Sequence, residues 1–316
     1  MLNYPTLIEV CGQDHLHDYP SCLYRAEYRQ RCTLAQDELQ MDWDPLFVSG
    51  TSEELEAHFT PEGAVSFLWS RRRPRQLYRL DREGETPRRL VDQMLRLARF
   101  SPDGRAIAFL APDTDRGATW DWGLWMSDAD GGNVRRIPTP GVPVRHLDFS
   151  PDGKWLWLSL WSYREPLLRG LYRYELATGQ LTRESNGDFQ EFCVSPDGRS
   201  LLFLGGRGEQ CLGLFDTATG REKVLRWISQ ESLGMGESDL VGPHFSPDGG
   251  RLFYSVHHYG EDWSLSQLCA TLPDGAATRV MWEEEAPARL VVPRCLPPAP
   301  RELELVGAGR MSRKLP

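Results

Sequence analysis

The sequence predicts an all-β fold, a six-bladed β-propeller of four-stranded antiparallel blades. Three observations lead to this prediction. One pentapeptide recurs along the chain, its copies lie 41 to 51 residues apart, and β-rich runs follow each copy in a similar layout. A period of about 40 to 50 residues is typical of a four-stranded propeller blade. A ring of six such units accounts for most of the 316 residues.

The repeated segment reads Phe-Ser-Pro-Asp-Gly. It begins at Phe100, Phe149 and Phe245, with variants at Val194 and Phe59. Proline presets φ, aspartate accepts hydrogen bonds from nearby backbone amides, and glycine supplies a positive φ. The segment therefore predicts a tight turn between the first two strands of each blade.

Two more strands complete each unit. In the blade that begins near Phe149, the third strand is expected at 170–176, before a second turn at Ala177-Thr178-Gly179. The equivalent strand and turn near Val194 are expected at 213–216 and 218–220. Each unit thus reads as an antiparallel meander.

The two ends of the chain are expected to close the ring. A sixth, eroded copy at 295–300 precedes a β-rich run at 302–306, so a last blade is expected to start near Leu296. The segment 23–29 resembles the third strand of a blade. We therefore expect pairing between 23–34 and 303–306, which would remove exposed sheet edges.

This closure gives one domain, residues 1–316. Residues 1–54 form the N-terminal segment that completes the last blade, and residues 55–310 hold the repeats. A five-bladed ring with two irregular ends is the alternative.

The Phe-Ser-Pro-Asp-Gly-(Lys/Arg) repeats resemble those of the TolB-like (WD40-like) β-propeller family. Similar repeats occur in the propellers of prolyl oligopeptidases and oligogalacturonate lyases. The resemblance implies the fold, but propellers host unrelated activities, so it implies little about function. The chain departs from TolB in lacking an export signal and the domain that precedes its propeller, and from the oligopeptidases in lacking a G-x-S-x-G nucleophile elbow.

The composition indicates which classes of partner the protein has and in which cellular compartment it works. A formal net charge of −9 makes a nucleic-acid partner unexpected, although 71–99 holds ten arginines, which we interpret as a solvated blade edge. The chain shows no signal peptide and no apolar run long enough for membrane insertion. Seven scattered cysteines without a CxxC pair favour reduced thiols, and hence a cytoplasmic protein.

The repeat also predicts which side chains line the axial channel, because the strand before each turn is the innermost one. The residue before the aromatic of each copy is His58, Arg99, Asp148, Cys193, His244 or Cys295, and two residues earlier lie Glu56, Leu97, His146, Glu191, Gly242 and Pro293. Three of the seven histidines thus occupy equivalent positions.

Imidazoles beside carboxylates bind divalent metals or transfer protons near neutral pH. We take His58, His146 and His244 as candidate metal ligands, with a divalent metal ion as the candidate cofactor. His146, His244, Asp148 and Glu191 are the candidate catalytic residues. Resemblance to the oligogalacturonate lyases implies a histidine-held metal. The alternative is that these groups satisfy backbone and inter-blade hydrogen bonds.

Aromatic and charged residues gather in the expected loops between second and third strands. These loops should emerge on the face opposite the turns, where aromatics with convergent polar groups suit ligand recognition. The candidate ligand-binding residues are Trp120, Asp121, Trp161, Tyr163, Arg164, His258, Tyr259 and Trp263. Packing of some rings between blades is the alternative.

Two functions follow. The first is a binding module that holds a protein, peptide or small ligand on the loop-rich face. The second is a metal-assisted lyase, hydrolase or isomerase with a histidine-lined site in the axial channel. The absence of a catalytic signature favours the binding module, and the metal-assisted enzyme is the alternative.

Overall fold

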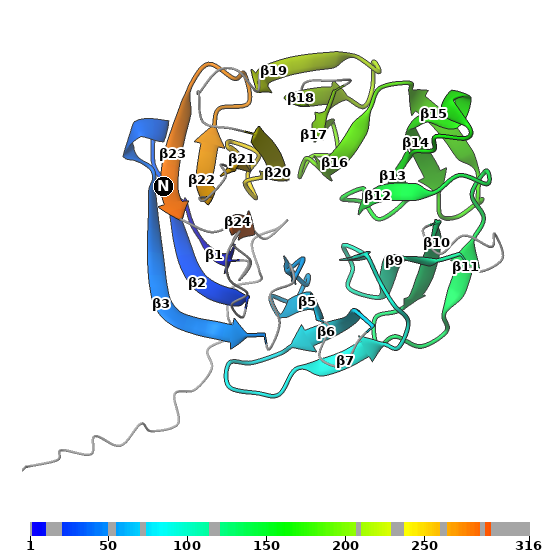
Figure 1. Ribbon diagram of the computed structural model, residues 1–316, viewed down its shortest axis with the longest axis horizontal. Coiled ribbons are helices and arrows are strands. Elements are labelled where there is room, and N and C mark those ends of the chain that lie inside the picture. Colours follow the sequence, from blue (N-terminus) through cyan, green and yellow to red (C-terminus); the bar gives the residue numbers. More distant parts are fainter. Residues whose placement is uncertain are drawn as a thin grey trace, which may run out of the picture.

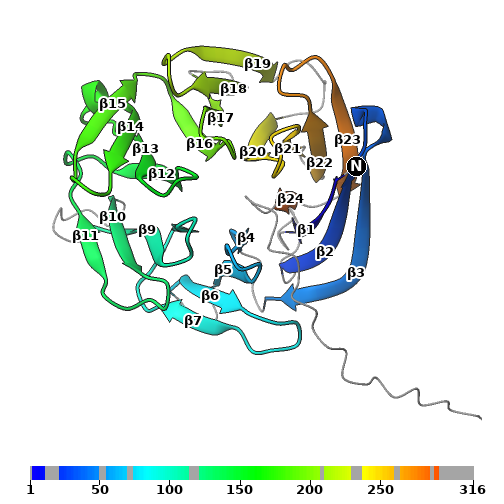
Figure 2. The same cartoon turned by 180° about the vertical axis from the view of Figure 1, so that it is seen from behind.

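The computed structural model describes residues 2–10, 21–49, 55–69, 74–113, 121–206, 210–228, 237–259, 264–284 and 288–291. Within these residues the strands form six four-stranded antiparallel sheets. The sheets stand around a common centre as the blades of a propeller (Figures 1 and 2). The six-bladed prediction is confirmed, and the five-bladed alternative is wrong.

Each of the first five blades is one continuous stretch of chain, ordered from the inner to the outer strand. Blade 1 holds β4 (His58–Phe59), β5 (Val65–Trp69), β6 (Gln76–Leu80) and β7 (Arg88–Val91). Blade 2 holds β8 (Leu97–Phe100), β9 (Ala106–Pro112), β10 (Trp122–Asp128) and β11 (Arg135–Ile137). Blade 3 holds β12 (Val144–Phe149), β13 (Trp155–Leu160), β14 (Gly170–Glu175) and β15 (Leu181–Ser185). Blade 4 holds β16 (Phe189–Val194), β17 (Ser200–Gly205), β18 (Gln210–Asp216) and β19 (Glu222–Ile228). Blade 5 holds β20 (Glu237–Phe245), β21 (Leu252–Tyr259), β22 (Ser264–Thr271) and β23 (Thr278–Glu284).

Blade 6 joins the two ends of the chain. Its order is β24 (Ala288–Val291), β1 (Leu2–Val10), β2 (Cys22–Gln30) and β3 (Glu38–Val48). The N-terminal strands close the ring as predicted, and β2 is the third strand of its blade. The pairing of 23–34 with 303–306 is wrong, because β2 lies between β1 and β3.

The error has a simple cause. The N-terminus contributes three strands instead of two, since β1 fills the second position and pairs with β24. The inner strand therefore comes from 288–291, ahead of the eroded copy. The segments 295–300 and 302–306, and with them Pro293, Cys295 and Leu296, lie outside the described residues.

The repeated turn is held by its serine as well as by its aspartate. In the turn at Phe100, the Ser101 hydroxyl donates to Asp103 Oδ1 at 2.6 Å and accepts the Ala106 N–H at 2.9 Å. The Arg105 N–H donates to the same Asp103 oxygen at 3.1 Å. Equivalent bonds recur in the other three Ser-Pro-Asp-Gly turns. The serine therefore links the turn to the start of the next strand.

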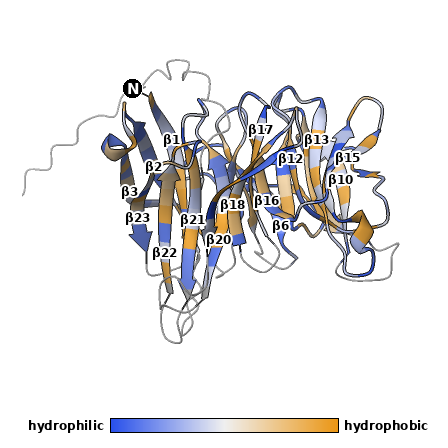
Figure 3. Cartoon of the chain, turned by 90° about the horizontal axis from the view of Figure 1, so that it is seen from above, coloured by the Kyte–Doolittle hydropathy of each residue, from blue (hydrophilic) through white to orange (hydrophobic). Residues whose placement is uncertain are grey.

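Apolar side chains fill the spaces between neighbouring blades. One buried cluster joins Leu110 and Leu124 of blade 2 to Leu147 and Leu158 of blade 3. Figure 3 shows hydrophobic segments along the strands of adjacent blades, where the sheets face one another. Burial of these faces drives the blades together, so each blade depends on the next.

The seam between blades 5 and 6 also holds a buried ion pair. Arg251 Nε donates to Asp37 Oδ2 at 2.5 Å, and the two side chains are 8% and 0% exposed. Tyr28 donates its hydroxyl proton to the same oxygen at 2.7 Å, and the Arg31 N–H donates to Oδ1 at 2.6 Å. Arg279 donates to the backbone carbonyl of Asp37. This network ties the N-terminal segment to the fifth blade.

No helix in the described part of the chain is long and apolar enough to cross a membrane.

We predict that acid weakens the repeated turns. The Ser101 hydroxyl and then the Arg105 N–H lower the pKa of Asp103, and the pKa of Asp197 is lowered likewise, first by Ser195. Burial opposes the effect at Asp152 and Asp248, but their hydrogen bonds still lower the pKa. A carboxyl with a lowered folded-state pKa stabilises the fold above its unfolded value near 3.9, and this contribution is lost as pH falls through the folded value.

The urea midpoint should therefore fall between pH 5 and pH 2. A variant with alanine at Ser101, Ser150, Ser195 and Ser246 should show a shallower fall. An equally steep fall in this variant would show that the serine hydroxyls do not set the acid response.

We also predict that the seam between blades 5 and 6 is sensitive to loss of one charge. Asp37→Asn or Arg251→Met leaves the other group buried without its partner, so each should lower the free energy of unfolding by about 3–5 kcal/mol. The measurement is urea unfolding followed by tryptophan fluorescence. Arg89→Met is the control, because Arg89 and Asp92 are 51% and 77% exposed and such pairs contribute about 0–1 kcal/mol. Equal effects of the buried and exposed variants would contradict the prediction.

Candidate functional site

The repeat-equivalent positions of four blades converge on the axis. Arg99 Nη1 of blade 2 contacts His58 Nε2 of blade 1. The His58 ring also lies edge-on to His244 of blade 5, with ring centroids 6.4 Å apart. Cys193 of blade 4 lies within electrostatic reach of Arg99. Four of the six residues that precede the aromatic position of a repeat, His58, Arg99, Cys193 and His244, therefore lie near one another.

Burial of Cys193 and the positive charge of Arg99 determine the chemistry of these four residues. Burial raises the pKa of the Cys193 thiol to about 11, against smaller lowering effects of the Phe245 backbone and Arg99. A thiol with this pKa stays protonated near neutral pH and is a poor nucleophile. His58 Nε2 contacts the Arg99 guanidinium. A positive charge at this place opposes binding of a second cation next to it.

The structure gives the predicted metal ligands different surroundings. His58 and His244 lie together, whereas the buried His146 packs against Phe192 of blade 4 at 4.7 Å between ring centroids. Among the residues that the structure describes, no group of three or more His, Cys, Asp or Glu side chains is arranged to hold a metal ion.

Asp148, a predicted catalytic candidate, joins two blades. Its Oδ2 accepts the Val194 N–H of β16 at 2.9 Å, and its Oδ1 accepts the Phe149 N–H at 3.1 Å. The residue is 1% exposed. Val194 belongs to the inner edge of blade 4, where a backbone N–H has no further strand to pair with. The carboxylate supplies the missing acceptor.

Glu191 performs the same task one blade further on. Its Oε2 accepts the Gly242 N–H of β20 at 2.9 Å. Gly242 has φ +62° and lies where the register of β20 shifts against β21. Gln210 supports the same strand by accepting the Leu240 N–H at 2.6 Å. The polar groups between blades 4 and 5 thus satisfy the irregular inner strand.

The same device at the ring closure uses a residue that the sequence analysis missed. Glu9 of β1 is 1% exposed, and its carboxylate accepts the N–H groups of Leu55, Glu56 and Ala57 at 2.6, 3.3 and 3.2 Å. Glu56, a predicted channel residue, has φ +48°. A glutamate alternating with apolar residues in Leu7-Ile8-Glu9-Val10 was the available signal.

The loop between β13 and β14 carries the predicted aromatic surface of blade 3. The rings of Trp161 and Tyr163 meet edge to face at 4.2 Å, and the Arg169 guanidinium lies 4.8 Å from the Trp161 centroid. Arg145 approaches the same Trp161 ring at 5.7 Å. Tyr163 is nevertheless 81% exposed. The loop presents aromatic area that the fold does not bury.

Hydrogen bonds hold this loop in shape. The Ser162 hydroxyl accepts the Arg164 and Glu165 N–H groups at 3.1 and 3.3 Å. Arg169 Nε donates to the Ser162 carbonyl at 2.5 Å, and a 3-10 turn, η3 (Pro166–Leu168), follows. Leu167 in that turn is 83% exposed. The exposed side chains therefore stand on an ordered backbone.

Arginines gather next to this loop. Arg96 is exposed, yet surrounding protein desolvates its guanidinium, and this lowers its pKa. Arg145 and Arg75 lower the same pKa further, while Glu56 and Glu191 partly offset them. Arg145 also pairs with Asp188, with 3.6 Å between Nη1 and Oδ1. Arginines and carboxylates of blades 1 to 4 are therefore mixed next to this loop.

The remaining predicted ligand-binding residues are placed unevenly. Asp121 is half-buried just before β10, and its carbonyl accepts the Asp113 N–H at 2.8 Å. The loop expected from His257 begins later, because β21 continues to Tyr259. His258 is 3% exposed, and its ring bonds to Ser238 at 2.9 Å. Trp120 and Trp263 lie outside the described residues.

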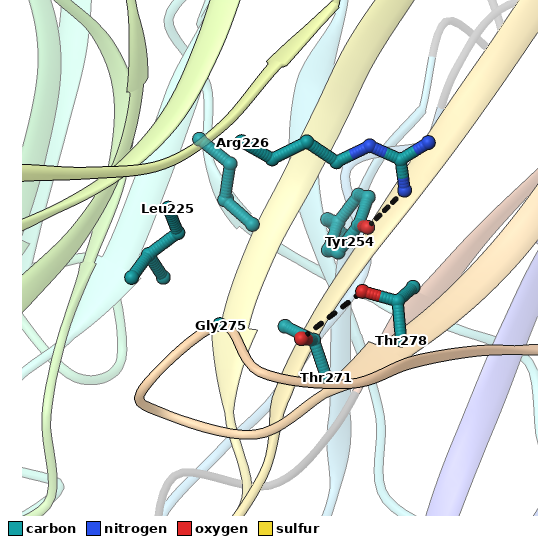
Figure 4. Close-up of a pocket in the computed structure, with 7 residues that line it drawn as sticks. Leu225, Arg226, Tyr254, Thr271, Gly275 and Thr278 are labelled. Carbon is teal, nitrogen blue, oxygen red and sulfur yellow. Dashed lines mark hydrogen bonds between the residues drawn. The ribbon is translucent and has the colours of Figure 1, made fainter.

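A cavity of about 170 Å³ lies off the axis, between blades 4 and 5 (Figure 4). Arg226 donates to the Tyr254 hydroxyl at 2.9 Å, and Thr278 donates to Thr271 Oγ1 at 3.1 Å. Thr271 in turn donates to the Ala277 carbonyl at 2.6 Å. These polar groups satisfy one another, so we interpret the cavity as part of the seam between the blades.

No protein-family model and no curated protein sequence matches the chain. Solved structures do match. TolB from Acinetobacter baumannii superposes with a TM-score of 0.67 and 16% identity, over 91% of this chain and 66% of that chain. A putative TolB from Agrobacterium tumefaciens superposes with a TM-score of 0.59 and 16% identity, over 90% of this chain and 91% of that chain. Hydrazine synthase from Kuenenia stuttgartiensis superposes with a TM-score of 0.51 and 16% identity, over 72% of this chain and 66% of that chain. The likeness shows the fold.

We predict that Asp148 and Glu191 act through stability. Asp148→Asn or Glu191→Gln replaces one acceptor oxygen by an NH₂ group. Loss of a hydrogen bond to a charged group costs about 1.5–3 kcal/mol of unfolding free energy, measured by urea denaturation. Glu165→Gln on the exposed blade 3 loop is the control and should change little. Catalytic groups are often kept at the expense of stability, so variants that are as stable as the wild type, or more stable, would contradict this assignment.

Proposed function

We propose that this propeller is a binding module of the TolB-like repeat family, which holds a peptide segment or small ligand of anionic character on its loop-rich face. The ring pair of the half-buried Trp161 and the exposed Tyr163, fixed by Arg169, carries the proposal. Large rings give much contact area with few rotatable bonds, and tryptophan, tyrosine and arginine are the residues most often found at binding hot spots.

The order of the loop supports this function. Ser162 and Arg169 bond the loop to itself, so little conformational entropy remains to be lost when a partner binds. Tyr163 and Leu167 are more than four-fifths exposed. Exposed apolar side chains on an ordered backbone are typical of interaction sites.

Charge indicates the ligand class. Arg96 and Arg145 lie near the loop, and Arg164 and Arg169 belong to it. Guanidinium groups bind carboxylates and phosphates through paired hydrogen bonds. We therefore expect a ligand with one or more anionic groups beside an apolar or aromatic contact. Trp120, Asp121, His258, Tyr259 and Trp263 remain predicted contacts from the neighbouring blades.

We further propose that the protein works in a reducing compartment such as the cytoplasm. The five described cysteines are free thiols, and three of them are buried. The metal-assisted alternative is not favoured, because the positive charge of Arg99 lies against His58, one of the three candidate ligands.

The test uses a random 12-residue peptide library selected on the immobilised wild-type protein. Selected peptides should carry aspartate or glutamate. Their affinity, measured by fluorescence anisotropy, should fall about 5- to 100-fold in Tyr163→Ala and in Trp161→Ala, as for hot-spot aromatics. Leu167→Ala should give a smaller loss.

Trp227→Ala is the matched control. Trp227 is 55% exposed on the outer strand of blade 4, away from this loop. Circular dichroism of each variant checks that the fold is intact. Peptides that bind Tyr163→Ala and Trp161→Ala as tightly as the wild type would place the binding face elsewhere.

A further inference from the structure

The outer strand of blade 6 is interrupted in its middle. In the ladder between β2 and β3, Tyr24 pairs with Pro45 and Ala26 pairs with Met41. Three residues, Asp42-Trp43-Asp44, therefore stand opposite Arg25 alone. The Asp44 N–H donates to Asp42 Oδ1 at 3.2 Å, which closes a local turn. A bulge of this kind interrupts strand pairing and re-aims a side chain.

The re-aimed side chain is a tryptophan that stands beside two more rings. Trp43 is 63% exposed. Its ring centroid lies 6.2 Å from that of Trp282 on β23, with the planes tilted by 51°. The ring of Tyr24 on β2 has its centroid 6.1 Å from that of Trp43, with an angle of 68° between the ring planes. Rings from blades 5 and 6 thus form an open, angled surface on the rim of the propeller.

Acidic residues lie next to two of these rings in the sequence. Asp42 and Asp44 flank Trp43 in the bulge, and Glu284 lies two residues after Trp282 on the same face of β23. Burial first, then Cys22, and also the nearby Glu284 raise the pKa of Tyr24. Arg25, opposite the bulge, bonds both Asp42 and Glu83. Among the charged residues named at this site, carboxylates outnumber the single cation.

Other outer strands show a different composition. β7 and β11 present exposed arginines. β19 has the comparably exposed Trp227, but it lies in a strand with Lys223 and Arg226. An exposed tryptophan on an outer strand therefore does not always have two acidic residues beside it in this fold. The acidic surroundings are a property of the Trp43 site.

We propose that Tyr24, Trp43 and Trp282, with Asp42, Asp44 and Glu284, bind an arginine side chain in a basic segment of a partner protein. A guanidinium stacks on the face of an indole through cation–π attraction, while carboxylates accept its N–H protons. The negative field of the bulge complements such a segment. This rim site lies on β3 and β23, across the ring from the blade 3 loop (Figures 1 and 2), and takes the opposite charge.

The test is ¹⁹F NMR of the full-length protein labelled with 5-fluorotryptophan, with resonances assigned by single Trp→Phe variants. The probe is the peptide acetyl-Gly-Gly-Arg-Gly-Gly-amide. Its control is the same peptide with citrulline, which has the shape of arginine without the charge. The Trp43 and Trp282 resonances should shift saturably with the arginine peptide only. The Trp227 resonance should stay unchanged.

Two variants separate the contributions of ring and charge. Trp43→Ala should weaken binding of the arginine peptide about 2- to 30-fold, the range of cation–π energies, read from the Trp282 resonance. Asp42→Asn/Asp44→Asn keeps the rings and should also weaken binding, and added salt should then matter less. Thermal melts confirm that both variants fold.

Equal shifts with arginine and citrulline, or no shift of Trp43, would overturn the proposal. Sedimentation velocity tests a second copy of this chain as the occupant. Self-association that is lost in Trp43→Ala, without any arginine-specific shift, would assign the surface to that contact instead.

Discussion

The inner edge of every blade poses the same physical problem. Its innermost strand has a partner on one side only, so the backbone N–H groups on the other side face the axis or the next blade without a ladder to join. Side chains of the preceding blade solve this problem. Asp148 accepts the Val194 N–H, Glu191 accepts the Gly242 N–H, and Glu9 accepts three N–H groups across the ring closure. Each bond is made across a seam, so each blade helps to complete the strand of its neighbour.

This constraint explains why polar residues in an inner strand are ambiguous in a sequence. The repeat assigns Asp148, Glu191 and His58 to inner strands, and the structure places all three there. Whether such a group has chemistry to perform depends on its partner, which comes from another blade. For Asp148 the partner is a backbone N–H 46 residues away, and for His58 it is Arg99. The spacing of the repeat predicts the position of each residue along its inner strand. It does not predict the rotamer of the side chain or its hydrogen-bond partners.

The fold was more readable than the site, because each turn is a local structure. Serine, proline, aspartate and glycine act within a few residues of one another, so the pentapeptide identifies the turn and its period gives the blades. The turn that was eroded near Leu296 offered no such signal, and the missed strand β1 displaced the expected pairing of β2. In the same way, His257 and His258 read as loop residues, whereas strand β21 buries both. The aromatic loop of blade 3 was found because its residues are contiguous. The Trp43 surface was not found, since it needs two strands that are more than two hundred residues apart.

Ring closure has a consequence for recognition on the rim. Closing the propeller gives the sixth blade its four strands, but each blade still ends in an outer strand with one free edge, where another chain could add. In β3 the bulge at Asp42-Trp43-Asp44 interrupts the pairing with β2 and places two aspartates in the outer strand. Bulges and charged side chains are features by which natural edge strands resist pairing with another chain. The bulge would then both protect the strand against unspecific association and present the ring of Trp43. A partner that binds the ring must carry a charge opposite to that of the two aspartates.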